Sequence, residues 1–272
     1  MIKALLIGFG NIGKIHAKYL EKNKIDWSWS DLDKNAGPHE KYESLNRINE
    51  YTHVFICTPE ETHINLYDDV VKNRQYRGKI FIEKPVVISH KDFNVFSDVN
   101  VFSGVVERFN PAVQALSRQI DPNKVINVDF SRCCSVPGDP NKSVSIVEDL
   151  GIHDLDILCF LLKVKNPDIS KQISSNGKTC ALTLAEDQKI YRFLWSQDTY
   201  YKERKIWVRQ NDCTFVADLI EQSVKKYESN NQISVYVEKS SSIENEQRAF
   251  FEGKICNSRD SHNLMLRVLS EA

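Results

Sequence analysis

A histidine with carboxylates at helical spacing is the first group of residues in this sequence that could carry out chemistry. Within residues 148–158, EDLGIHDLDIL, the residues Asp149, His153 and Asp156 are four and three positions apart, so a helix would place all three on one face. Histidine changes charge near neutral pH and a carboxylate can orient its ring, so the group suits acid–base catalysis. Asp154 is a competing acid that would point elsewhere. The alternative is a solvent-facing polar stripe on a core helix whose apolar side is Ile152, Leu155, Leu158, Cys159 and Leu162.

A glycine-rich turn near the start of the chain is the second candidate. Gly8, Gly10 and Gly13 form a G-x-G-x-x-G pattern between the apolar residues 2–7 and the helix-like residues 12–20. A strand, this turn and a helix are the context that a dinucleotide-binding motif requires. Gly8 would permit the tight turn, Gly10 would let the backbone approach a pyrophosphate, and Gly13 would let helix and strand pack closely. Three glycines in an ordinary tight loop are the alternative.

The residues after the glycine turn sharpen this prediction. Asn11 and Ile12 would begin the helix, and their backbone N–H groups would face the phosphate. Asp31 follows the strand-like residues 25–30, close to the position about 20 residues along where such folds place an acid that binds the ribose 2′-hydroxyl. Its carboxylate would repel a 2′-phosphate, so we predict NAD rather than NADP. Asp31 and Asp33 could instead be ordinary turn residues.

Strand-like and helix-like segments alternate through the first part of the chain. Further strands are expected at residues 52–57, 79–82 and 101–106, with helices at 61–72 and 91–98. This alternation predicts an α/β fold with a doubly wound parallel sheet, a Rossmann dinucleotide-binding domain, over residues 1–110. Ligands of such sheets sit at the carboxyl ends of the strands, where the sequence has Thr58, Glu83, Lys84, Arg108 and Asn110.

The second part of the chain, residues 111–272, predicts an α+β domain with a mostly antiparallel sheet. Strands are expected at residues 125–134, 178–184, 189–196, 205–209, 214–218 and 233–238, with helices in the 150s, at 244–256 and at 262–272. An exposed sheet face with aromatic residues is compatible with self-association, so we expect a homo-oligomer, a dimer or tetramer. The aromatic residues in question are Tyr200, Tyr201, Trp207 and Phe215.

Composition narrows the class of protein. The 272 residues carry a net charge of -1, so no basic excess points to nucleic acid. Seven cysteines, an odd number without a C-x-x-C pair, argue against a disulfide framework or a zinc site, and we expect no metal. The adjacent Cys133 and Cys134 would point to opposite faces of a strand. The first residues lack a signal-peptide pattern and an apolar run long enough to span a bilayer, so we expect a soluble cytoplasmic protein without a membrane partner.

An ordered set of motifs resembles the Gfo/Idh/MocA family of NAD(P)-dependent sugar oxidoreductases. The motifs are GFGNIG, CTPEETH, EKP, ERFNPAV and EDLGIHDLDIL, and the resemblance is densest over residues 1–162. EKP followed by a D-x-G-x-H-x-x-D pattern is more diagnostic than the glycine turn. ERFNPAV and DLGIHDLDI look more like the branch that contains UDP-N-acetylglucosamine 3-dehydrogenases than like the inositol dehydrogenases.

The resemblance implies roles for the residues at the predicted strand ends. Lys84 of EKP would lie near nicotinamide and substrate, where its ammonium group could donate to a sugar oxygen. Thr58 and Pro59 would line the cofactor groove, and Glu83 would lie near the nicotinamide ribose. His63 matches a frequent family histidine of the cofactor site, although it could be only a helix-face residue.

The resemblance also implies a reaction. His153 would take the proton of a sugar hydroxyl while hydride passes to NAD, with Asp149 orienting the ring or touching the sugar, which would belong to a nucleotide sugar such as a UDP-N-acetylhexosamine. Arg108 and Asn110 could meet cofactor or substrate, although Arg108 could simply pair with an acid. Arg132 could bind a phosphate or be a surface arginine. Two other functions stay open: reduction of a keto-sugar, and non-catalytic sensing of a sugar or cofactor. The second domain would bind the substrate and form the oligomer interface.

Overall fold

The computed structural model describes residues 1–134, 145–229 and 231–271, which fold into two compact units. The first unit comprises Met1–Val105 and Glu246–Arg259, and the second comprises Val106–Asn245 and Asp260–Ala272. The observed division after Val105 differs from the predicted one after residue 110. A larger difference is that a segment near the end of the sequence returns to the first unit, which a single boundary does not allow.

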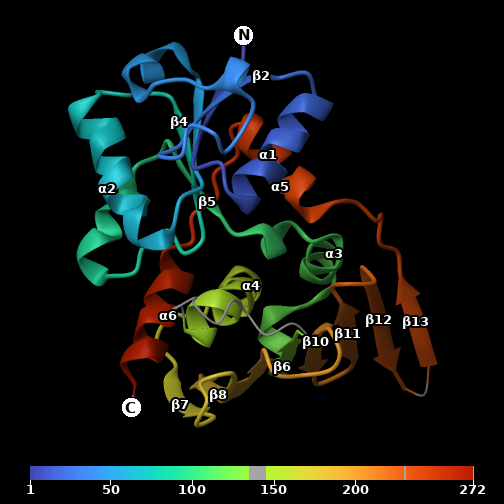
Figure 1. Ribbon diagram of the computed structural model, residues 1–272. Coiled ribbons are helices and arrows are strands. Elements are labelled where there is room, and N and C mark those ends of the chain that lie inside the picture. Colours follow the sequence, from blue (N-terminus) through green and yellow to red (C-terminus); the bar gives the residue numbers. More distant parts are fainter. Residues whose placement is uncertain (135–144, 230, 272) are drawn as a thin grey trace. The chain divides into compact units, whose positions relative to one another are not determined.

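The first unit is built on a sheet of five parallel strands in the order β2-β1-β3-β4-β5 (Figure 1). The strands are β1 (Lys3–Ile7), β2 (Asp26–Ser30), β3 (His53–Ile56), β4 (Lys79–Glu83) and β5 (Val101–Gly104). The predicted doubly wound sheet is therefore confirmed. The strand order reverses between β1 and β3, and such a reversal opens a crevice for ligands at the carboxyl ends of the strands.

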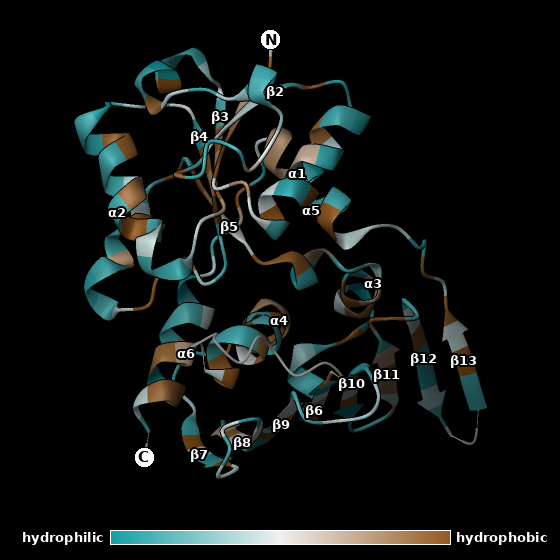
Figure 2. Cartoon of the chain, in the orientation of Figure 1, coloured by the Kyte–Doolittle hydropathy of each residue, from teal (hydrophilic) through white to brown (hydrophobic). Residues whose placement is uncertain are grey.

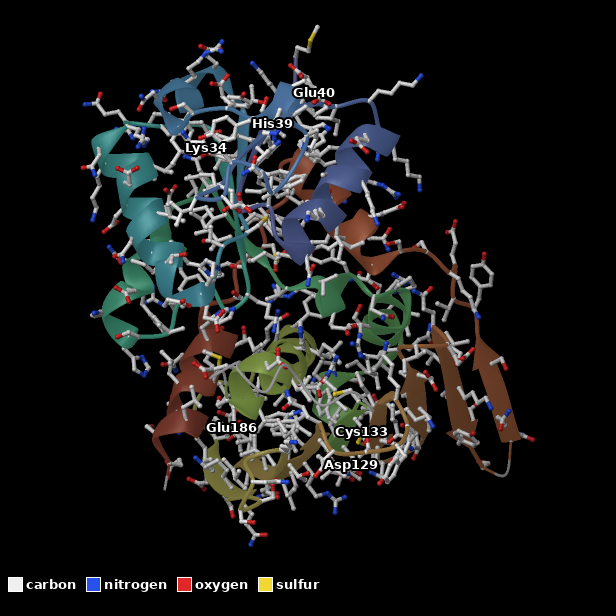
Figure 3. All side chains as sticks on the ribbon, viewed as in Figure 1. Lys34, His39, Glu40, Asp129, Cys133 and Glu186 are labelled. Atoms are coloured by element: carbon white, nitrogen blue, oxygen red, sulfur yellow. The ribbon has the colours of Figure 1, made fainter. Side chains whose placement is uncertain are left out.

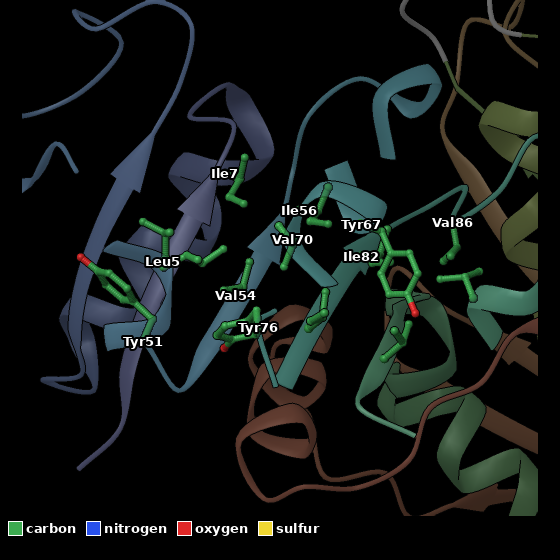
Figure 4. Packing of buried hydrophobic residues seen from close by; sticks show 14 of the residues in the cluster. Leu5, Ile7, Tyr51, Val54, Ile56, Tyr67, Val70, Tyr76, Ile82 and Val86 are labelled. Carbon is green, nitrogen blue, oxygen red and sulfur yellow. The ribbon is translucent and has the colours of Figure 1, made fainter. Parts of the chain in front are cut away.

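Apolar side chains cover both faces of this sheet, and its central strands are brown in Figure 2. On one face, Tyr67 of α2 (His63–Asp68) packs with Val54, Ile56, Ile82 and other apolar residues in one buried cluster (Figure 4). On the opposite face, α1 (Asn11–Lys22) places His16 5.0 Å from the ring of Phe55.

The returning segment completes that second face. Phe250 of α5 (Ser242–Phe251) packs its ring 5.1, 5.5 and 5.4 Å from those of Phe55, Phe81 and Phe102, measured between ring centroids. These four side chains are buried. Burial of large aromatic surface is strongly favourable, so this contact explains why residues 246–259 belong to the first unit.

The second unit contains a sheet of eight strands in the order β13-β12-β11-β10-β6-β9-β8-β7. The strands are β6 (Val125–Cys133), β7 (Asp168–Ile173), β8 (Thr179–Glu186), β9 (Lys189–Ser196), β10 (Glu203–Gln210), β11 (Thr214–Asp218), β12 (Ser223–Glu228) and β13 (Asn231–Val235). Among the described strands of this second sheet, only the pair β6–β9 is parallel, which confirms the predicted mostly antiparallel sheet.

Three helices accompany this sheet: α3 (Pro111–Gln119), α4 (Ile152–Leu162) and α6 (Arg259–Ser270). A turn of π-helix, Val147–Gly151, leads into α4. Gly151 lies beneath an indole ring, and a Cβ atom there would come within 2.8 Å of the ring of Trp195. The absence of a side chain at Gly151 therefore lets the start of α4 approach β9 closely.

Several predicted elements differ in detail. The helix expected at residues 61–72 is a 3₁₀ turn, α2 and a π-helical turn, and residues 91–98 correspond to a 3₁₀ helix, His90–Ser97. The strand expected at 101–106 ends at Gly104. The elements α3, β7 and β12 were not predicted. Strands β7 and β12 lie at or near an edge of the sheet and carry many polar residues, so apolar and polar residues do not alternate clearly along them.

The aromatic face expected in this sheet is not a single face. Phe215 is buried at 1% exposure, and it pairs with Val208, whereas Trp207 pairs with Val216. Because side chains alternate along a strand, Phe215 and Trp207 point to opposite faces. Tyr200 and Tyr201 precede β10 and are exposed at 105% and 56%. The prediction of one aromatic patch was therefore wrong.

Candidate functional site

The glycine turn has the geometry that its sequence predicts. Gly8 has a positive φ of 91°, a conformation that favours glycine, and its N–H donates to the carbonyl oxygen of Ser30 at 2.8 Å. A Cβ atom on Gly13 would lie 2.3 Å from the carbonyl oxygen of Gly8. The backbone of α1 thus packs directly on the turn, and Gly10 is the N-cap residue from which the helix with Asn11 and Ile12 begins. An anion placed before this helix would meet its first N–H groups.

A pocket of about 670 Å³ opens beside this turn. That volume lies in the range of small-molecule sites. It brings together five predicted cofactor residues, Gly8, Gly10, Asp31, Thr58 and Pro59. The other lining residues are Ile7, Ser30, Leu32, Lys34, Tyr42, Ser44, Leu45, Asn46, Cys57, Thr62, Leu66 and Arg74. Apolar walls with a few polar groups suit an adenosine moiety, so the residues present fit one end of a dinucleotide.

Asp31 makes the turn contacts that one of the two interpretations of its sequence position predicts. One carboxylate oxygen accepts the N–H of Phe9 at 2.7 Å and the other accepts the N–H of Asp33 at 3.0 Å, so the side chain holds the turn. A carboxylate has about four lone-pair positions, so acceptor capacity remains toward the pocket. Lys34 follows in the same loop (Figure 3), with its ammonium group 5.9 Å from the centroid of the Tyr42 ring. Negative and positive groups therefore share this end of the pocket.

Glu83 and Lys84 lie at the end of β4. One oxygen of Glu83 is 2.8 Å from Nε2 of the fully buried His16, and the other accepts the backbone N–H of Lys84 at 3.2 Å. The Glu83 carboxylate thus joins α1 to the backbone of the predicted catalytic lysine. Neither side chain is among those that line the pocket of 670 Å³, and the peptide bond from Lys84 to Pro85 is cis.

His63 is the cofactor residue that the structure corrects. Its side chain is 1% exposed and does not line the pocket. Its ring nitrogens lie 2.8 Å from the carbonyl oxygens of Pro85 and Thr58. Carbonyl oxygens only accept hydrogen bonds, so both contacts are made together when both nitrogens carry protons. His63 therefore holds the end of β3 to the segment after Lys84 instead of presenting its ring to a ligand.

In the second unit, the predicted acid–base pair lies at the start of α4. His153 is half-buried in the first turn of the helix. Asp149, in the preceding π-helical turn, accepts a hydrogen bond of 2.8 Å from Nε2 of Gln197. Gln197 directly follows β9, so the sheet orients this carboxylate. A partly exposed histidine and a fixed carboxylate on adjacent turns can bind and exchange a proton.

The third member of the predicted face has a different environment. Asp156 is 1% exposed, and its carboxylate receives Arg108 Nε at 3.0 Å, Arg108 Nη2 at 2.5 Å and the hydroxyl of Ser261 at 2.9 Å. Asp156 therefore does not share the accessible environment of His153, and the alternative of a solvent-facing polar stripe fails at this residue, because a tertiary ion pair buries it. Arg108 is correspondingly engaged by Asp156 and lies 5.4 Å from the centroid of the Phe160 ring, so the predicted pairing with an acid is observed, while its contact with cofactor or substrate stays a prediction.

Asn110 is also a structural residue rather than a substrate ligand. It is the N-cap of α3, where its side chain accepts the N–H of Ala112 at 3.0 Å and donates to the carbonyl oxygen of Leu219 at 3.0 Å. It is 4% exposed. Asparagine followed by proline is a helix-start signal, so the Asn110–Pro111 pair could have identified both the cap and the helix that the sequence analysis missed.

Arg132 belongs to a buried charge network that sequence reasoning also missed. It is 2% exposed and donates to Asp154 from Nε at 3.0 Å and from Nη2 at 2.7 Å, and to Glu107 at 3.0 Å. Arg204 donates to the same oxygen of Glu107 at 2.7 Å, and the indole of Trp195 donates to Asp154 at 3.0 Å. The sequence did contain a signal for this burial. Side chains alternate along a strand, so Arg132 lies on the same face of β6 as the buried Val128 and Phe130.

The network is charge-balanced, with two arginines and two carboxylates. Burial by itself would raise the pKa of Glu107, but the charges of Arg132 and Arg204 outweigh it and hold that pKa below its usual value. Burial likewise opposes the charge on Arg132, yet Asp154 and Glu107 raise its pKa further above the usual value. Glu107 and Arg132 are therefore charged at neutral pH, and Arg132, buried among these partners, is not the surface residue that was considered.

The described residues contain no cluster of three or more His, Cys, Asp or Glu side chains that could hold a metal ion. None of the seven cysteines, all of which lie in described parts of the chain, forms a disulfide. No helix among the described residues combines the length and the apolar character needed to cross a bilayer.

The fold, with its parallel sheet and its mostly antiparallel sheet, matches solved structures along nearly the whole chain. The structure is similar to UDP-N-acetylglucosamine 3-dehydrogenase GnnA from Acidithiobacillus ferrooxidans, with a TM-score of 0.87 and 18% identity over 98% of this chain and 96% of that one. It is similar to the dehydrogenase MviM from Clostridium difficile, with a TM-score of 0.81 and 12% identity over 100% of this chain and 99% of that one.

Two curated proteins are similar in sequence. Inositol 2-dehydrogenase of Rhizobium meliloti is 29% identical over 181 residues, 58% of this chain and 54% of that protein. The scyllo-inositol 2-dehydrogenase (NAD(+)) of Bacillus subtilis is 26% identical over 196 residues, 62% of this chain and 56% of that protein. The chain thus spans about half the length of the curated relatives it matches. No protein-family model matches it. The ordered motifs resemble the Gfo/Idh/MocA family, and these similarities in sequence and fold agree with that resemblance.

Proposed function

We propose that this protein is an NAD-dependent oxidoreductase that acts on a CH–OH group of a sugar or polyol. The observation that carries the proposal is the pocket at the carboxyl ends of β1–β3, which combines a glycine turn, apolar walls and the carboxylate of Asp31. The sequence similarity to two inositol dehydrogenases supports the substrate class.

The residues of the first unit would hold the cofactor. The N–H groups after Gly10 suit the pyrophosphate, Asp31 suits the ribose hydroxyls, and Thr58 and Pro59 form part of the wall. When bound, NAD supplies the acceptor for the hydride that leaves the substrate carbon. NAD is proposed over NADP because Asp31 would repel a 2′-phosphate, although Lys34 in the same pocket weakens that repulsion.

Side chains of this protein would accept the proton of the substrate hydroxyl and stabilise its oxygen. An imidazole nitrogen of His153 accepts the hydroxyl proton as the C–H bond breaks, and Asp149 holds the ring or a neighbouring hydroxyl. The ammonium group of Lys84 donates a hydrogen bond to the same oxygen, which stabilises the negative charge that develops there. Glu83 and His63 would hold the backbone that carries Lys84. Glu83 accepts the N–H of Lys84, and His63 contacts the carbonyl oxygen of the next residue, Pro85.

A nucleotide sugar is the substrate that we propose within this class. The support is the similarity of fold, over 98% of the chain, to a UDP-N-acetylglucosamine 3-dehydrogenase. We also propose a cytoplasmic homo-oligomer, a dimer or tetramer. Seven cysteines without a disulfide suit a reducing compartment. On the sheet of the second unit, Ile190 and Leu194 of β9 are exposed at 47% and 44%, which suits association between copies.

The first experiment mixes purified protein with NAD at equal concentration and adds UDP-N-acetylglucosamine, myo-inositol or scyllo-inositol in separate samples. Equal concentrations matter because an unfavourable oxidation can stop after one bound turnover. A rise in the absorbance of reduced nicotinamide with one compound supports the dehydrogenase and identifies its substrate class. No rise with any compound, in protein that binds NAD by calorimetry, contradicts an oxidation of these substrates and favours the reductase or sensor alternatives.

A further inference from the structure

Helix α4 carries the proposed proton acceptor, yet its apolar side chains do not specify how the helix is rotated about its axis. Ile152, Leu155, Ile157, Leu158 and Leu161 are all buried, at 0–7% exposure, and their directions are spread over more than half of the helix circumference. An ordinary amphipathic helix is oriented by one apolar stripe. A helix with so broad an apolar surface gains similar burial over a range of rotations, so other contacts must decide where His153 points.

The first such contact is the buried Asp154, next to His153 in sequence. Both of its oxygens are engaged by the sheet: Arg132 of β6 donates two hydrogen bonds to one oxygen, and Trp195 of β9 donates one to the other. A paired guanidinium and carboxylate restricts direction as well as distance. Rotation of α4 would break all three contacts and leave the Asp154 carboxylate buried without these partners, while Arg132 would keep only Glu107.

The second contact acts from the other side of the helix. Asp156 is two positions from Asp154, which corresponds to about 200° around the helix axis. It binds Arg108, which lies beside Glu107 in the 3₁₀ turn Val106–Phe109, and Glu107 in turn binds Arg132. One short turn is thus connected to both carboxylates of the helix, and the two contacts together allow a single rotation.

Energetics separate this role from simple stabilisation. The attraction within a buried ion pair is largely offset by the loss of hydration, so apolar residues of similar volume often support the fold equally well. What such a pair can add is a unique arrangement, as a single buried polar residue does in coiled coils. The charge network here joins three segments far apart in the chain around a helix that lacks an apolar stripe.

We propose that Arg132 and Asp154 are positioning residues that set the rotation of α4 and thereby the direction of the His153 imidazole. The inference rests on the proposed function, because His153 must be the proton acceptor for its direction to affect turnover. It predicts that the pair is needed for catalysis more than for folding.

The test replaces both partners with apolar residues in the full-length protein, R132M/D154L. Glu107 and Arg204 remain as a neutral pair, so no single buried charge is left. The control is Val224→Ala. Val224 of β12 is 1% exposed and lies outside the charge network, so its truncation removes core packing without changing a residue of α4 or of the network. We expect thermal unfolding of R132M/D154L no lower than that of the control, kcat at least 10-fold below that of the control, and a Kd for NAD within two-fold of wild type.

A kcat equal to that of the control would overturn the proposal, since the pair would then contribute only to stability. So would a loss of NAD affinity that matches the loss of kcat. If wild-type protein shows no turnover with any substrate, or if His153→Ala keeps full turnover, the proposed function fails and kcat no longer tests the positioning role.

The proposal is then decided by nuclear magnetic resonance. The ring C–H signal of His153, assigned by its disappearance in His153→Asn, should be a single narrow line in wild type and Val224→Ala. It should broaden or split in R132M/D154L, because the helix gains alternative rotations. A single narrow line at an unchanged position in all three proteins overturns the proposal whether or not the protein is active.

Discussion

The pocket beside the glycine turn in the first unit and the α4 region of the second unit depend on different parts of the polypeptide. The pocket depends on backbone: a positive φ at Gly8, the close approach of Gly13 and the N-terminus of α1. The α4 region depends on side chains, with buried carboxylates that need arginines from other segments. The first kind of site is sensitive to added volume, whereas the second is sensitive to the loss of one partner. The predictions below separate these two sensitivities.

The largest effect is expected at His153. His153→Ala removes the proposed proton acceptor, and general-base catalysis contributes about 10²–10⁴-fold to a rate. We expect kcat to fall by about that factor, while the Kd for NAD, measured by calorimetry, stays within two-fold because the pocket is in the first unit. Turnover within three-fold of wild type would remove His153 from the mechanism.

The next effect concerns the stability of the second unit. Asp154→Asn leaves the buried guanidinium of Arg132 short of one negative charge, and breaking a buried ion pair costs about 3–5 kcal/mol. The double variant R132M/D154L should be more stable than this single variant, although Trp195 loses its acceptor at a cost of about 1–3 kcal/mol. Urea unfolding at pH 7 measures both. The reverse order of stability would show that the pair itself, rather than charge balance, supports the fold.

A smaller effect is expected at the pocket. Asp31→Asn removes the negative charge while keeping the size of the side chain, and a hydrogen bond to a charged group contributes about 1.5–3 kcal/mol. We expect about 10-fold weaker binding of NAD and tighter binding of NADP than in wild type. Glu43→Gln, outside the pocket lining, is the matched charge control. Wild-type protein that binds NADP more tightly than NAD would contradict the assignment of the cofactor.

The smallest effect is a pH dependence in the first unit. Burial, together with the charge of Lys79, lowers the pKa of His53 to about 4. Between about pH 6.5, the usual pKa of histidine, and pH 4, the unfolded chain binds a proton on His53 that the folded chain does not. The free energy of unfolding should therefore decrease as the pH falls through this window, and His53 should contribute no slope above it.

His53 packs its ring 5.1 and 4.8 Å from those of Phe250 and Phe251, so His53→Phe keeps an aromatic ring in place. The difference in unfolding free energy between wild type and His53→Phe, followed by urea titration, should change between pH 6.5 and 4 and stay constant from pH 7 to 8. A difference that is flat across the acid window would mean that His53 titrates normally in the folded protein.

Much of the first unit could be predicted because its signals are local. A glycine is needed wherever φ is positive or two backbones touch, and strands buried on both faces read as continuous apolar runs. The parallel sheet, the turn with Gly8 and Gly13, and the presence of Asp31 and Thr58 at one pocket follow from such signals. The return of α5 to this unit could not be predicted, since the aromatic partners of Phe250 are distant in sequence.

The sequence by itself determined the fold class, the glycine turn and the position of His153 at the start of a helix. Only the tertiary structure decided which polar side chains hold segments together: His63 and Asn110 are buried, and Arg108 pairs with the buried Asp156. The physical reason is that a polar side chain has one role in water and another when buried, and burial depends on which distant segments supply its partners. Arg132 and Asp154 are ordinary polar residues in the sequence, and only the fold makes them a pair.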